Sequence, residues 1–105
     1  MSLKLLIAPD GISVDELIKI YTLFCEAYKI EVDERDEQFL RTRGIKDLHK
    51  GHLDYRPSVG AKFFGQRIGN TIQFHGYSYP DDPEWKAKDE QFIKLFIQYY
   101  GKKPQ

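Results

Sequence analysis

Apolar residues recur every three or four positions from residue 13 to residue 28, which is the period of a helix with a buried face. That face consists of Leu17, Ile20, Tyr21, Phe24 and Tyr28. Ser13 and Glu16 stand just before it with the spacing of a capping box, in which each side chain satisfies a backbone amide of the other. The pattern therefore predicts a long helix over residues 13–28.

Shorter elements are predicted on both sides of this helix. The apolar run at residues 3–8 predicts a short strand, because a cluster of turn residues follows it. Asp33 or Asp36 is expected to cap a short second helix, and Gly44 is expected to end it in a left-handed conformation. A third helix over residues 45–50 would stop at Gly51, and Arg56 before a proline would begin a loop.

Residues 61–79 predict a β-hairpin whose two-residue turn is Gly69 and Asn70. With that turn, Ile68 pairs with Thr71, and the pairs counted outward alternate between two faces. The mostly apolar face is expected to lie on the core and carries Ala61, Phe63, Gly65, Arg67, Ile72, Phe74, Gly76 and Ser78. The mixed face carries Lys62, Phe64, Gln66, Ile68, Thr71, Gln73, His75 and Tyr77.

A last helix is predicted from Asp82 as the cap and Pro83 as the first residue to about Tyr100. The stretch from residue 92 to residue 100 is apolar almost all round. Such a helix either lies at the centre of the core or meets a second copy of itself in a homodimer.

Together these elements predict a single α+β domain over residues 1–105: a short N-terminal strand, a long helix, two short helices, a β-hairpin and a long C-terminal helix. Helices followed by a basic hairpin resemble a winged-helix module over residues 12–79. The resemblance implies that the short helix at residues 45–50 enters the DNA major groove and that the hairpin contacts the DNA backbone. Hydrophobic residues make up 41% and charged residues 30% of the chain, a globular composition.

The single cysteine, Cys25, excludes an intramolecular disulfide and makes a reducing cytoplasm the expected location. No apolar run approaches the ~20 residues of a membrane span, so we expect no membrane association.

Charge is unevenly distributed along a chain whose net charge is zero. Residues 1–39 hold four basic and nine acidic residues, whereas residues 40–70 hold seven basic and two acidic ones. A local excess of +5 attracts phosphates at short range, because salt screens more distant charges. The alternative is a solvated basic face that pairs with the acidic first third of the chain.

These observations define a candidate nucleic-acid interface made of two groups of side chains. The residues expected to meet phosphates are Arg41, Arg43, Lys46, Lys50, Lys62 and Arg67. The residues expected to meet bases or sugars are Phe64, Gln66, Gln73, His75 and Tyr77. Flat aromatic rings beside amides and cations suit stacking on bases and hydrogen bonding to their edges.

Catalytic and metal motifs are incomplete in this sequence. His49, His52, Asp54 and His75 are the densest potential zinc ligands, but no second pair stands at a recognised spacing. We therefore predict no metal site, no cofactor and no catalytic residues, and we favour a binding function while an enzymatic one stays open.

The leading hypothesis is a small nucleic-acid-binding protein, with DNA and RNA both open. One alternative is a protein–protein interaction module or inhibitor, of the kind that mobile elements carry, dimerising through its C-terminal helix. Another is a small-ligand-binding protein with a pocket lined by Tyr55, Phe64, His75 and Tyr77.

Overall fold

A computed structural model describes residues 12–58, 61–68, 71–78 and 83–101. In chain order its elements are α1 (Val14–Tyr28), α2 (Glu34–Phe39), the π-helical turn η1 (Leu40–Gly44), α3 (Ile45–Lys50), β1 (His52–Ser58), β2 (Ala61–Ile68), β3 (Thr71–Ser78) and α4 (Trp85–Gly101). The predicted α+β class is confirmed. The strand predicted at residues 3–8 lies outside the described residues.

Helix α1 begins and ends for local reasons that the sequence contains. The Ser13 hydroxyl accepts a hydrogen bond from the Glu16 backbone N–H at 3.1 Å, which is one half of the predicted capping box. At the other end, Lys29 adopts a left-handed conformation with φ 58° and its N–H contacts the last carbonyls of the helix. Every residue of the predicted apolar face is buried.

The segment from α2 through η1 to α3 is one uninterrupted helical stretch, which corrects the prediction for Gly44. Asp33 caps it by accepting from the Arg35 backbone N–H at 2.9 Å. Gly44 has φ −60°, a right-handed value, so it does not end a helix. A Cβ there would lie 2.9 Å from Leu40 Cδ2, so a larger residue would force the Leu40 side chain to shift in a close-packed contact. The stretch ends at Gly51, as predicted.

The sheet is antiparallel with strand order β1-β2-β3. Strands β2 and β3 pair as predicted, from Ile68 opposite Thr71 out to Ala61 opposite Ser78. The loop predicted to start at Arg56 is wrong, because Arg56 lies in β1. Pairing of β1 with β2 is irregular after Tyr55, and β1 is an edge strand, a position that tolerates proline.

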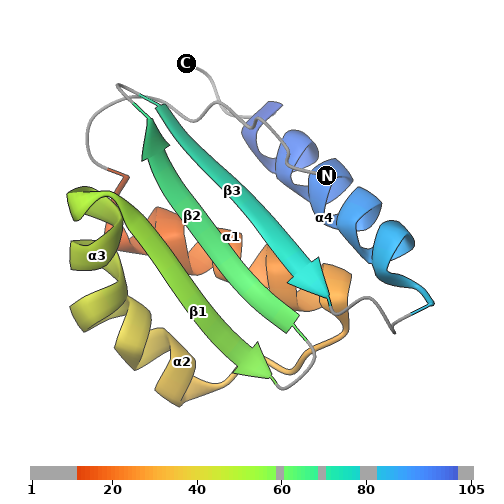
Figure 1. Cartoon of the computed structure of the whole chain (residues 1–105), viewed down its shortest axis with the longest axis horizontal. Coiled ribbons are helices and arrows are strands. Elements are labelled where there is room, and N and C mark those ends of the chain that lie inside the picture. Colours follow the sequence, from red (N-terminus) through yellow and green to blue (C-terminus); the bar gives the residue numbers. More distant parts are fainter. Residues whose placement is uncertain (1–11, 59–60, 69–70, 79–82, 102–105) are drawn as a thin grey trace.

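The described helices pack against one face of the sheet, here called the inner face, which carries Phe63, Gly65 and Phe74. Figure 1 shows α1 crossing behind the three strands, with α3 beside β1 and α4 beside β3. The Phe24 ring of α1 lies 5.1 Å from the Phe63 ring, and Phe96 of α4 lies 6.3 Å from Phe74. The opposite face, the outer face, carries none of these helices.

The winged-helix resemblance is not confirmed by this arrangement. The expected recognition helix, α3, is six residues long and continues directly from η1. It packs its buried Leu48 toward Gly65 on the inner face of the sheet. This side of α3 is therefore part of the core.

Helix α4 contributes Phe92 and Phe96 to the core, where both are almost fully buried. It is not buried all round, because Ile97 remains 54% exposed. Within the described residues, no helix combines the length and the apolar character needed to cross a bilayer.

Candidate nucleic-acid interface

Four of the predicted phosphate-binding residues lie on the η1–α3 stretch. Arg41 and Arg43 come from η1, and Lys46 and Lys50 come from α3. All four are exposed. Lys46 and Lys50 stand one turn apart, so their side chains share one side of α3. We call these four residues the helical cations.

Two of the helical cations have acidic partners. Arg41 lies 3.5 Å from an Asp15 carboxylate oxygen, and Arg43 lies 3.8 Å from an Asp47 oxygen. Exposed pairs of this kind are weak, at about 0–1 kcal/mol. Lys46 and Lys50 have no acidic partner among the residues that the structure describes. The expected pairing of the basic segment with the acidic first third is therefore seen at Arg41.

The outer face of the sheet brings together part of the predicted base-binding set. Phe64 of the central strand is half-buried, and Gln66 beside it is exposed. Gln73 of β3 stands opposite Gln66 in the ladder. His75 and Tyr77 occupy ladder positions opposite Phe64 and Lys62, but their side chains lie outside the described part of the structure.

Arg67 is separated from the other predicted phosphate contacts. It follows Gly65 by two positions in β2 and so belongs to the inner face. Its backbone N–H donates to the Gly51 carbonyl at 2.8 Å, which ties β2 to the end of α3. The structure therefore places the Arg67 backbone at a structural junction between these elements.

Strand β1 adds two residues to the outer face that the sequence analysis did not place there. His52 pairs with Gln66 in the ladder and Asp54 pairs with Phe64. The His52 and Phe64 rings lie 6.2 Å apart at 22°, a stacked arrangement. Recognition of β1 as a strand would have identified both positions, since alternation then puts them on this face.

Lys62 belongs to the same arrangement through two contacts. Its ammonium lies 3.1 Å from an Asp54 oxygen and 5.9 Å from the centre of the Phe64 ring. Lys62 is therefore neutralised locally and is less able to attract phosphate than Lys46 or Lys50. The outer face combines an aromatic pair, a carboxylate and amides.

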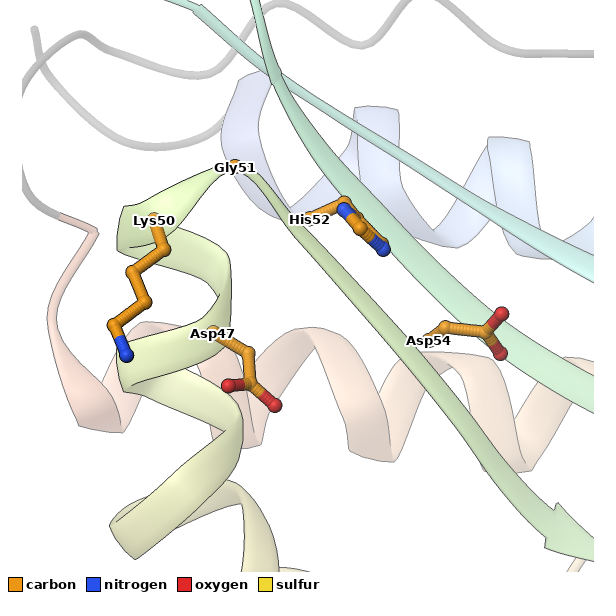
Figure 2. A pocket seen from close by; sticks show the side chains of 5 residues that line it. All are labelled: Asp47, Lys50, Gly51, His52 and Asp54. Atoms are coloured by element: carbon orange, nitrogen blue, oxygen red, sulfur yellow. The ribbon is translucent and has the colours of Figure 1, made fainter.

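A groove of about 440 Å³ joins the outer face to the end of α3. It is lined by Asp47, Lys50, Gly51, His52 and Asp54. Figure 2 shows His52 and Asp54 directed over the sheet, while the Lys50 side chain runs alongside α3. The groove thus has the Lys50 cation on one side and His52, one of the two stacked rings, on the other.

The pocket predicted from Tyr55, Phe64, His75 and Tyr77 is not formed as proposed, because Tyr55 pairs with Phe63 and lies on the inner face. The Tyr55 ring stacks on Phe39 at 4.5 Å, and its hydroxyl donates to Asp36. Tyr55 is thus held inside the molecule, away from the outer face.

Asp36 accepts a second hydrogen bond from the Tyr21 hydroxyl at 2.8 Å and is only 7% exposed. Burial is the largest cause that raises the pKa of Tyr21 and Tyr55 above the ordinary value of 10, and the Asp36 hydrogen bonds add to it. Both tyrosines therefore remain hydroxyl donors at neutral pH.

No group of three or more potential metal ligands converges in the described part of the chain. His52 and Asp54 share the groove, whereas His49 is exposed on α3. The His75 side chain belongs to the residues that are not described.

Comparisons of this chain with protein-family models, with curated proteins and with solved structures found no match.

Proposed function

We propose that this protein binds nucleic acid, with the helical cations on the phosphates and the outer face of the sheet on bases or sugars. The observation that carries the proposal is the exposed pair Lys46 and Lys50, which lacks acidic partners among the described residues. A lysine that already has a carboxylate partner must lose it to bind phosphate, whereas these two do not.

The position of this pair next to the groove supports the same proposal. Lys50 lines the groove together with His52, so the cationic side of α3 is continuous with the stacked rings. Phosphate contacts supply affinity and position, and contacts to bases supply selectivity. Both kinds of contact are available on adjoining surfaces, with no need for a helix in the major groove.

The experiment is fluorescence anisotropy with labelled duplex DNA, single-stranded DNA and single-stranded RNA at two salt concentrations. The variant Lys46→Gln with Lys50→Gln removes two charges from α3. The matched control, Lys86→Gln with Lys94→Gln, removes two exposed charges from α4, which lies beside the opposite edge strand (Figure 1).

The α3 double variant is expected to weaken binding to all sequences equally. Its log–log salt slope should fall in magnitude by about 1.4 to 1.8, since each phosphate contact contributes roughly 0.7 to 0.9. The α4 control should keep the slope of the unchanged protein. No binding at low salt, or equal loss in both double variants, would refute the proposal.

A second candidate function is protein interaction through a homodimer of α4. The observation that favours it is Ile97, which is 54% exposed one turn after the half-buried Ile93. Single exposed apolar residues are common on protein surfaces, so this support is weaker than that of the lysine pair. Sedimentation equilibrium of the unchanged protein and of Ile97→Lys tests it: a dimer that the variant converts to monomer supports this candidate.

A further inference from the structure

We infer that the nucleic acid is single-stranded, and that one of its bases stacks on the His52–Phe64 pair with its amino group on Asp54. This inference deepens the proposed function and rests on it. It also assigns roles to His52 and Asp54, which lie on β1 at the edge of the sheet.

The preference for single-stranded over double-stranded nucleic acid follows from the shape of the surface. Stacking needs the flat face of a base, and a duplex buries those faces between neighbouring base pairs. The His52 and Phe64 rings come from adjacent strands and are nearly parallel, and His52 is exposed, so a base lying parallel to them can extend the stack. A major groove admits a helix or a two-stranded ribbon, whereas this face has three strands.

The preference for one kind of base follows from the charge beside the His52 and Phe64 rings. Asp54 stands opposite Phe64 in the ladder, and Asp47 lines the far side of the groove. A carboxylate only accepts hydrogen bonds, and although Asp54 is paired with Lys62 at 3.1 Å, its remaining lone pairs can accept from a base. The groove therefore favours a base edge that carries an amino group, with the phosphates on the Lys46–Lys50 side of α3.

Cytosine and uracil make the sharpest pair for testing this preference. Both are single-ring bases of similar size, but cytosine presents an N4 amino donor where the uracil-type base presents an O4 acceptor. Cytosine can donate to Asp54, whereas the O4 atom of uracil would face a carboxylate oxygen. We expect a single-stranded C-tract to bind about fivefold or more tightly than a U-tract, which corresponds to the net contribution of roughly one hydrogen bond.

The experiment measures anisotropy with ten-nucleotide C-tract and U-tract RNA and with a mixed-sequence duplex. Phe64→Leu removes the ring but keeps an apolar side chain, and Tyr99→Leu removes a half-buried ring from α4 as the matched control. Asp54→Asn replaces the acceptor with an amide that both donates and accepts. Urea unfolding of each variant verifies that it is folded at the assay temperature.

The expected result is single-stranded binding above duplex binding, with Phe64→Leu weaker by about tenfold at an unchanged salt slope. Asp54→Asn should bring the C-tract and U-tract affinities together, and Tyr99→Leu should change neither. Duplex binding as tight as single-stranded binding, or a Phe64→Leu variant that binds normally, would overturn the inference. If the α3 double variant still lowers the salt slope in that case, the proposed function stands and only the inference of single-stranded binding is wrong.

Discussion

Asp89 of α4 gives the protein a pH-dependent stability whose sign and size follow from its surroundings. Its carboxyl accepts a hydrogen bond from the Tyr28 hydroxyl of α1, at the contact between the two longest helices. Burial raises the pKa of Asp89 from its ordinary value of 3.8 to about 6. Between these two values the folded protein holds a proton that the unfolded chain releases.

The contribution of this proton therefore stabilises the fold below pH 4 and is lost as the pH rises toward 6. A shift of about two units corresponds to about 3 kcal/mol, because one unit is worth about 1.4 kcal/mol. Asp89 is only partly buried, so screening by solvent reduces this to about 1–2 kcal/mol.

The variant Asp89→Asn removes the titration and keeps an oxygen that accepts from Tyr28. Urea unfolding at pH 7 should show the variant more stable than the unchanged protein by about 1–2 kcal/mol, and the two should converge at pH 4. Glu90→Gln removes the same charge from an exposed neighbouring position and controls for net charge. A difference between Asp89→Asn and the unchanged protein that is equal at both pH values would refute the reasoning.

Two further predictions concern the core. Gly65→Ala should cost about 1–3 kcal/mol in urea unfolding, because a Cβ there would lie 2.8 Å from Phe74 Cε1. The cost should shrink in the Phe74→Leu background, and an equal cost in both backgrounds would mean that this contact is not its cause. Cys25 is buried, which raises the pKa of its thiol to about 11, so a disulfide reagent at pH 8 should modify it only after unfolding in urea. Rapid modification of the folded protein would contradict this.

The hairpin was predictable residue by residue because its turn signal has one geometric solution. With Gly69 and Asn70 as the two loop residues, the pairing of Ile68 with Thr71 fixes every other pair. The structure has that register, and Phe63 and Phe74 are fully buried on the predicted core face. Local geometry was sufficient here, since no distant contact was needed to choose between the faces.

Strand β1 was missed because its local signal contradicts its tertiary setting. Arg56 before a proline favours a loop, but the end of an edge strand accommodates a proline without loss of a central ladder bond. Gly44 was misassigned for a related reason, since its role is close approach to Leu40 and not a left-handed turn. Such packing requirements depend on neighbours that the sequence pattern does not place.

The candidate site was predictable in part for the same reasons. The exposure of Lys46 and Lys50 follows from helical periodicity, and the Phe64 face follows from hairpin register. The pairing of Lys62 with Asp54 and the stacking of His52 on Phe64 were not predictable without β1. Because of these two contacts, the site is a pair of stacked rings beside a carboxylate and not only a basic patch.

The buried carboxyl of Asp36 constrains how the sequence of this protein can evolve. Its two hydroxyl partners, Tyr21 and Tyr55, come from α1 and β1, so three separate segments meet at one polar point in an apolar interior. Loss of either tyrosine leaves a buried oxygen without a partner, which costs more than the hydrogen bond itself contributes. Sequences that keep this fold should therefore retain the three residues as a set or replace all of them together with apolar side chains.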